Sequence, residues 1–150
     1  MQTNAEYAKE WSENFALLEF AGLQLLIPQT DVYSLEPSVD MTPPSGISFD
    51  SVGEFVQSGQ VWSLYALSSD LDPLGVSPEN YRIAILLKNV QPVFGLLCEQ
   101  VDTVKRSEIS IHPIPDAMQN KNSPILALAL HDSILGYISS ASALSSLFLY

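Results

Sequence analysis

The residues of this chain that could take part in catalysis are few and far apart. His112 precedes Pro113 and His131 lies in a predicted hairpin turn, so both histidines are next to turns. A hydrolase that uses a serine and one of these histidines is one hypothesis, but the sequence has no Gly-x-Ser-x-Gly elbow to present the nucleophile. Loss of turnover after mutation of either histidine would support that hypothesis, and unchanged turnover would remove it.

The other groups that could bind metals or phosphates are also isolated. Cys98 lies in the apolar run FGLLC, where a buried inert thiol is favoured over a nucleophile. One cysteine and two distant histidines cannot build a structural zinc site, and no glycine-rich phosphate loop or dinucleotide fingerprint is present. Asp70 and Asp72 have no partners and indicate a solvated loop. The sequence therefore predicts a protein that is not an enzyme and uses no cofactor or metal.

The net charge of the chain is confined to its first half. Residues 1–80 hold one base, Lys9, and 12 acids, whereas residues 81–150 hold 5 bases and 5 acids, so the whole net charge of −11 lies before residue 81. Such a surface repels phosphate backbones and anionic lipids, which argues against nucleic-acid and membrane partners. Two interpretations stay open: a charge that serves solubility, or one that attracts a partner with a basic face and speeds association.

The length and the cysteine content limit the class of protein. A chain of 150 residues predicts one domain or two small fused subdomains, and a single cysteine excludes an internal disulfide. The start, MQTNAEYAKEW, lacks the basic residues and apolar run of a signal peptide, and no apolar run is long enough to span a bilayer. These features together predict a cytoplasmic protein.

The elements that would position a site occur twice along the chain. The strings FALLEFAGLQLLIPQTDVYSLEP, from Phe15, and RIAILLKNVQPVFGLLCEQVDTVKR, from Arg82, each predict a strand, a turn and a second strand. Each string then has two aliphatic residues spaced three apart, which are Val32 and Leu35 in one and Val101 and Val104 in the other. Residues 54–67 and 127–140 each predict a hairpin with a two-residue turn. This repeat indicates an internal duplication, with the cleft between the halves as a natural binding place.

Many short apolar runs separated by turn residues predict a mainly β protein built from small barrels. The expected strands cover about 15–20, 23–27, 31–35, 55–57, 60–67, 82–88, 93–101, 108–111, 125–130 and 133–138. Gly59 is expected to supply the positive φ of a turn at Ser58-Gly59. Gly95 is expected to let its strand approach a neighbouring strand closely.

Helices are expected only at the two ends of the chain. Thr3 and Glu6 have the spacing of a capping box that would begin a short N-terminal helix. The C-terminal helix is predicted from three residues that share one helical face, Leu144, Leu147 and Phe148. The expected organisation is a helical extension at 1–14, a first subdomain at about 15–70, a second at about 81–140, and a helix at about 141–149.

The order of these elements and several strings resemble the CheW-like domain of bacterial chemotaxis coupling proteins, over roughly residues 15–149. The string VFGLLCEQVDTV is similar to the family's Gly-Leu-x-Val-Asp-x-Val strand, with Gly95 and Leu96 in place. Residues 53–61 resemble the family's first-half hairpin around its Leu-Arg-Gly turn. The resemblance implies a fold of two tandem SH3-like β-barrels over residues 15–150, with short helices at the ends.

The resemblance also implies a function, that of an adaptor that couples chemoreceptors to a histidine autokinase in chemotaxis or pilus-type motility signalling. Family members use the ends of the first barrel for the kinase and the groove between barrels for the receptor tip. The partner-binding residues implied for this chain are Val32, Ser34, Leu35, Phe55, Ser58, Gly59, Trp62, Leu97, Val101 and Val104. Among them, Phe55, Ser58 and Gly59 belong to the expected kinase contact. The residues that would line or support the groove are Val32, Leu35, Leu97, Val101 and Val104.

The chain departs from the family pattern around the first-half hairpin. Ser58 stands where the turn usually carries Arg, Ser34 stands at a commonly acidic position, and residues 63–67 replace a Pro-Val-x-Asp-Leu strand. The departures concern contacts with a standard receptor and leave the apolar pattern of the barrel intact. Trp62 has two alternatives, an exposed interface anchor or a covered residue that fills the seam between barrels. The alternative function is a diverged double barrel that binds a small molecule or another protein in the inter-barrel cleft.

Overall fold

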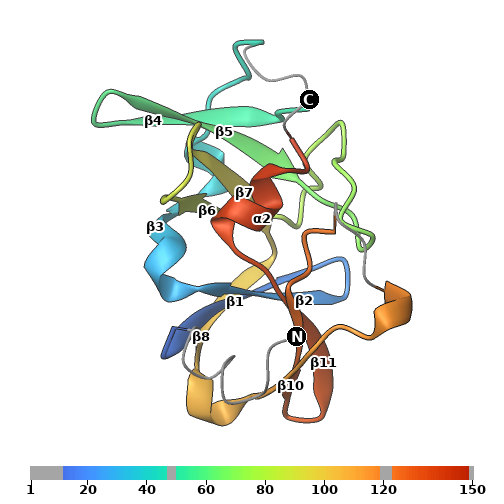
Figure 1. Cartoon of the computed structure of the whole chain (residues 1–150). Helices are drawn as coiled ribbons and strands as arrows, with labels where there is room; N and C mark the ends of the chain where they lie inside the picture. Colours follow the sequence, from blue (N-terminus) through green and yellow to red (C-terminus); the bar gives the residue numbers. More distant parts are fainter. Residues whose placement is uncertain (1–11, 47–49, 119–122, 149–150) are drawn as a thin grey trace.

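Two curled sheets, one above the other, make up most of this computed structural model, which describes residues 12–46, 50–118 and 123–148 (Figure 1). The six-stranded sheet has the order β8-β1-β2-β11-β10-β9, and the five-stranded sheet has the order β3-β6-β7-β5-β4. The strands of the six-stranded sheet are β1 (Asn14–Phe20), β2 (Leu23–Pro28), β8 (Gln100–Lys105), β9 (Ser110–His112), β10 (Ala127–His131) and β11 (Ile134–Ile138). Those of the five-stranded sheet are β3 (Val32–Pro37), β4 (Gly53–Gln57), β5 (Gln60–Ala66), β6 (Ile83–Leu87) and β7 (Phe94–Cys98).

Helical structure is limited to short segments. The helix α2 (Ala141–Ser145) lies against the five-stranded sheet (Figure 1). The 3-10 turns are η1 (Gln29–Asp31), η2 (Ser38–Asp40), η3 (Arg106–Glu108) and η4 (Asp116–Met118). The mainly β architecture and the short C-terminal helix are thus confirmed, although α2 ends before the expected residue 149. The predicted N-terminal helix at 1–14 lies almost wholly outside the described residues.

One predicted strand, 93–101, is wrong because two strands occupy this segment. β7 ends at Cys98 and β8 begins at Gln100, and the two belong to different sheets. Glu99 is the residue between them, and its carboxylate accepts hydrogen bonds from the Ala21 backbone N–H at 2.8 Å and from Asn80 Nδ2 at 2.6 Å. These contacts fix the point at which the chain passes from one sheet to the other.

Each sheet takes strands from both halves of the chain. The β1–β2 hairpin joins β8–β11, and the β6–β7 hairpin joins β3–β5. One strand of each half crosses to the hairpin of the other half: β3 pairs with β6, and β8 pairs with β1. In addition, β11 pairs in parallel with β2, and β5 pairs in parallel with β7. The repeat in the sequence therefore corresponds to a repeated strand order: hairpin, crossing strand, hairpin. The expected boundaries at 15–70 and 81–140 do not delimit the two sheets, because the first hairpin of each half pairs in the sheet completed by the other half.

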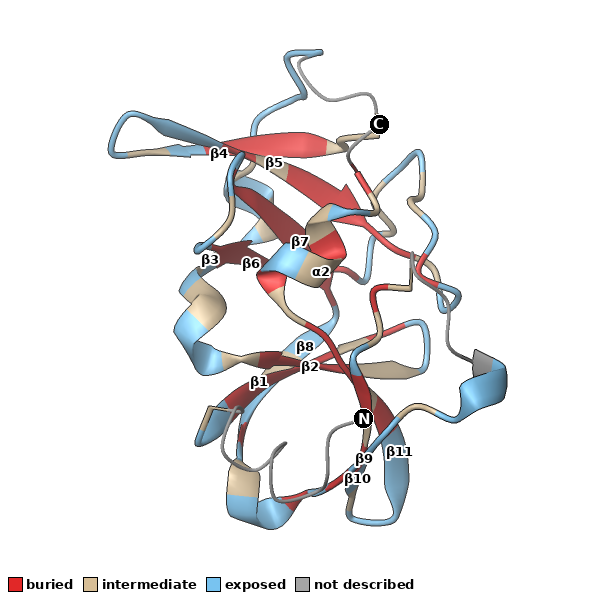
Figure 2. Ribbon diagram, in the orientation of Figure 1, coloured by how far each residue is buried: buried red, intermediate tan, exposed pale blue. Residues whose placement is uncertain are grey.

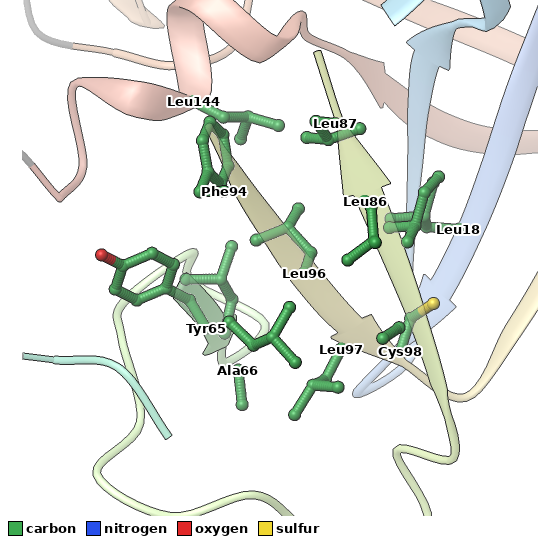
Figure 3. Packing of buried hydrophobic residues seen from close by; sticks show 14 of the residues in the cluster. Leu18, Tyr65, Ala66, Leu86, Leu87, Phe94, Leu96, Leu97, Cys98 and Leu144 are labelled. Carbon is green, nitrogen blue, oxygen red and sulfur yellow. The ribbon is translucent and has the colours of Figure 1, made fainter. Parts of the chain in front are cut away.

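β1 has apolar side chains on both faces and separates two hydrophobic clusters. Its residues Ala16, Leu18 and Phe20 belong to a larger cluster with the five-stranded sheet, and Phe15 and Leu17 belong to a smaller one inside the six-stranded sheet. This division follows from the alternation of side chains along a strand. Figure 3 shows Leu18 next to Leu86 of β6, on the larger side. The two barrels therefore share a wall, and its burial rather than a linker holds them together.

Candidate partner-binding surfaces

The chemistry-bearing side chains of the described residues do not converge on a catalytic centre. No three His, Cys, Asp or Glu side chains in the described ranges come close enough to hold a metal ion. Cys98 is buried, and burial raises the pKa of its thiol to about 12, so that the thiol is neutral near pH 7 and a poor nucleophile. His131 is 3.6 Å from Asp132 at the tip of the β10–β11 hairpin, and His112 is exposed on β9.

The β4–β5 hairpin turns at Ser58 and Gly59, as predicted. Both residues have positive φ, 51° and 77°, which is the conformation that a two-residue hairpin turn of this kind requires. Their exposure leaves them open to contact from outside. Next to the turn, Val56 and Val61 are directly opposite each other and are 60% and 40% exposed. Figure 2 shows this hairpin tip as an exposed projection from a buried sheet.

The opposite face of the same hairpin points inward. Phe55 and Trp62 form the adjacent cross-strand pair and are 8% and 1% exposed. The Trp62 indole Nε1 donates a hydrogen bond to the Leu87 carbonyl oxygen at 2.9 Å, and its ring centroid is 4.8 Å from that of Tyr33. Trp62 is therefore covered rather than an exposed anchor, and these two partners come from β3 and β6 of its own five-stranded sheet rather than from across the seam between the barrels. Phe55 and Trp62 support the hairpin from inside.

The end of β3 is tied to this hairpin by Glu36. The Glu36 carboxylate accepts hydrogen bonds from Gln57 Nε2 at 2.7 Å and from the Ser34 hydroxyl at 3.3 Å. The link ties β3 to the hairpin through the half-buried side of the strand, whereas Leu35 lies on its exposed side. The Tyr33 ring also reaches the hairpin, through its contact with Trp62. We call the exposed apolar residues there the hairpin surface, and they are Tyr33, Leu35, Val56 and Val61.

The residues expected to line an inter-barrel groove are not gathered on one surface. Leu97 is 1% exposed in the larger cluster, and Val104 is 3% exposed inside the six-stranded sheet, where it pairs with Phe15. Val32 and Val101 are half-buried against the larger cluster, on the edge strands β3 and β8. Leu35 is half exposed. The buried residues Leu97 and Val104 can therefore only support a contact. The other three residues, Val32, Leu35 and Val101, can reach a partner.

Two open hollows lined by described residues lie at one end of the six-stranded sheet. One has a volume of about 440 Å³ and the other about 390 Å³. Glu19, Gln24 and Ile134 line both of them, so the two hollows adjoin. Neither lies in the cleft between the sheets, where the small-molecule alternative would place a ligand.

Comparison with known proteins finds similarity at the level of structure and not of sequence. No protein-family model matches the sequence, and no curated protein matches it. The structure is similar to the crystal structure of the scaffolding protein TtCheW from Thermoanaerobacter tengcongensis, with a TM-score of 0.63 over 85% of this chain and 88% of that chain. The chain has a CheW-like fold. Sequence identity is 15%, so the likeness establishes the fold and leaves the function to be argued from the surface.

The CheW-like fold confirms the resemblance drawn from the sequence, but the sequence argument missed part of the exposed surface. Tyr33, Val56 and Val61 were not among the implied partner-binding residues, although Ser58 and Gly59 beside them were. The signal for the valines was available, because residues directly opposite across a two-residue turn share one face. The described residues include no helix with the length and apolar character that crossing a bilayer requires.

Proposed function

We propose that this chain is a non-catalytic cytoplasmic scaffold that binds a histidine kinase and a chemoreceptor in chemotaxis or pilus-type motility signalling. The observation that carries the proposal is the hairpin surface on a CheW-like fold. Its apolar side chains are 40–60% exposed, and Val56 and Val61 lie directly opposite each other; exposed apolar side chains of this kind are typical of protein interfaces. TtCheW is a scaffolding protein, and the same role is proposed here on this surface.

The kinase contact is assigned to the tip of the β4–β5 hairpin. Val56, Val61 and the turn residues Ser58 and Gly59 project from the sheet, and a rigid hairpin loses little conformational entropy on binding. The buried residues Phe55 and Trp62 would act only by holding the hairpin in place.

The receptor contact is assigned to the edge strands β3 and β8. Leu35 is the exposed apolar residue of β3, where Ser34 is its neighbour, and the half-buried Val32 and Val101 lie on β3 and β8 respectively. Leu97 and Val104 would support this surface from the core. A receptor tip would therefore meet side chains from both halves of the chain.

The test is recovery of a histidine kinase from lysate of the native cell by the immobilised protein, compared with two variants. Val56→Asp places a carboxylate in the hairpin surface, and we expect kinase recovery to fall by about tenfold or more because a charge would be buried at an interface. Val76→Asp is the matched control, since Val76 is 74% exposed in the loop between β5 and β6. Near-ultraviolet circular dichroism checks that both variants are folded.

Unchanged kinase recovery by Val56→Asp would overturn the hairpin assignment. Absence of any kinase or chemoreceptor with the folded native protein would overturn the scaffold proposal itself. A carboxylate at the buried Phe55 would be a poor test, because unfolding alone would abolish binding.

A further inference from the structure

The inner face of the six-stranded sheet changes from apolar to polar toward the end of the barrel at which Glu19 lies. On β1 the inward residues Phe15 and Leu17 are followed by Glu19, and on β2 the inward Leu26 is preceded by Gln24. On β8, Val104 is inward and Asp102 is the next residue on that face, directly opposite Leu17. Polar residues at core-facing positions of a barrel lower its stability and are typical of functional positions.

The hairpin β10–β11 supplies further polar residues at this end of the barrel. Ala129 is buried in the small cluster, and the next inward residue, His131, pairs with Ile134 next to the turn. Asp132 is exposed in the turn itself. We call this group the acidic mouth, and it consists of Glu19, Gln24, Asp102, His131, Asp132 and Ile134. All six line the hollow of about 390 Å³.

The carboxylates of the acidic mouth accept hydrogen bonds from neutral donors. Glu19 Oε1 accepts from Gln24 Nε2 at 3.2 Å, and Asp102 Oδ2 accepts from Gln100 Nε2 at 2.9 Å. Among the described residues, the ion pair at the mouth is the one between His131 and Asp132, which requires a protonated imidazole. The buried Gln24 Oε1 has no hydrogen-bond partner.

The backbones of Lys105 and Arg106, the bases at the end of β8, lie beside the start of β1 rather than beside Glu19, and the Arg106 backbone N–H donates to the Glu13 carbonyl oxygen at 2.7 Å. Lys105 is paired with Asn14, at the opposite end of β1 from Glu19. Glu108, which also lines the hollow, accepts a hydrogen bond from the backbone N–H of Lys105 rather than from its ammonium group. Within the part of the chain that the structure describes, neither Glu19 nor Asp102 forms an ion pair, so the mouth presents negative charge that attracts an incoming cation.

One exposed apolar side chain lies in the same opening, and two more lie on the back of the β10–β11 hairpin. Ile134 lies within it at 51% exposure, and Leu130 and Leu135 form a cross-strand pair on the outer face of the same hairpin at 40% and 51%. Figure 1 shows this hairpin projecting at the end of the molecule away from α2. A small inorganic cation would use the carboxylates and leave these side chains in water. A peptide that carries both kinds of group would use both.

We propose that the acidic mouth binds a segment of a partner protein that has a Lys or Arg side chain next to an apolar one. The cationic group meets the carboxylates of Glu19 and Asp102, and the apolar side chain packs on Ile134. Charge complementarity selects this occupant, because a nucleic acid or an anionic lipid would be repelled. The mouth lies in the six-stranded sheet and the hairpin surface in the five-stranded sheet, so this proposal and the proposed function can fail separately.

The test is a titration of the ¹⁵N-labelled full chain with the peptide acetyl-Leu-Lys-Arg-Leu-Lys-amide, followed by nuclear magnetic resonance. We expect amide shifts at the ends of β1 and β8 and at the β10–β11 hairpin, and a dissociation constant that rises as NaCl increases from about 50 mM to about 0.5 M. Glu19→Gln combined with Asp102→Asn is expected to weaken binding about fivefold, since each exposed charge pair contributes modestly.

Two matched controls separate this site from general attraction to an acidic protein. Asp70→Asn combined with Asp72→Asn removes the same charge from the exposed β5–β6 loop and is expected to change affinity less than about twofold. The peptide acetyl-Ser-Lys-Arg-Ser-Lys-amide keeps the charge and lacks the apolar side chains, and is expected to bind about fivefold more weakly. Equal weakening by the two double variants, equal binding of the two peptides, or no shifts at the mouth at about 5 mM peptide would each overturn the proposal.

Discussion

Gly95, in the middle of β7, is the residue at which close approach of neighbouring strands is most demanding. A Cβ added there would lie 2.7 Å from Leu64 Cδ2 and 2.8 Å from the Ile85 carbonyl oxygen, and the second of these atoms is backbone. Because the backbone cannot yield as a side chain can, Gly95→Ala is expected to lower the free energy of unfolding by about 2 kcal/mol. Urea unfolding followed by circular dichroism measures this change.

The control for that substitution is Gly75→Ala. A Cβ at Gly75 would have no atom within 4 Å, so this variant is expected to stay within about 0.5 kcal/mol of the native protein. If the Gly95 and Gly75 variants unfold at the same urea concentration, β7 can move away from its neighbours, contrary to the packing described above.

Single residues also show where reasoning from sequence reaches its limit. The turn at Ser58-Gly59 and the close approach at Gly95 were predicted, because glycine and short loops have local conformational causes. The inward direction of Phe55 and Trp62 was not settled. Alternation along a strand divides side chains between two faces, but the neighbouring strands decide which face is covered. For Trp62 the decisive partner is the Leu87 carbonyl, from a strand in the other half of the chain.

At the scale of elements, α2 is too short to be stable alone and depends on contacts from elsewhere. Asp31 Oδ2, in η1, accepts a hydrogen bond from the Ala141 backbone N–H at 2.9 Å, and Ser140 Oγ accepts one from the Ala143 N–H at 3.0 Å. Beyond the helix, Phe148 stacks on Tyr65 with ring centroids 3.7 Å apart. The first turn of α2 is thus held in part by a carboxylate from a distant turn.

Asp31→Ala is expected to destabilise this helix by about 1 kcal/mol, the usual cost of losing an N-terminal cap. Amide hydrogen exchange at Ala141 and Leu144 should become about fivefold faster, while exchange in the strands changes less. Asp40→Ala, at an exposed carboxylate in η2, is the control. Equally fast exchange at Leu144 in the two variants would mean that α2 does not need the Asp31 contact.

The strand predictions show which part of the fold is local. Hairpins such as β1–β2 and β4–β5 were placed within a few residues because apolar runs and turn residues lie next to each other in the chain. The break at Glu99 was missed, since FGLLCEQV reads as one apolar run and the donors that hold Glu99 come from residues 21 and 80. The acidic mouth was missed for the same reason: Glu19, Asp102 and His131 come together only when five strands pair in the order β8-β1-β2-β11-β10.

At the scale of the whole molecule, the exchange of strands makes the two halves of the chain depend on each other. β1 pairs with β8, β3 with β6, β11 with β2 and β5 with β7, so every one of these contacts joins one half to the other. A tandem pair of independent barrels would have no such pairs. The larger hydrophobic cluster likewise contains residues from both halves, among them Leu18 and Leu86.

Separation of the chain at Gly75, which is exposed between β5 and β6, tests this dependence directly. We expect each fragment, 1–75 or 76–150, to be unfolded when it is produced alone. Each fragment would leave strands without their pairing partners and would expose apolar residues that are buried between the two halves. Mixed in equal amounts, they are expected to form a folded one-to-one complex with the dispersed amide spectrum of the intact chain. A dispersed spectrum from either fragment alone would show that its hairpins can form a barrel without the other half. The strand exchange would then be a feature of the assembled fold rather than a requirement for folding.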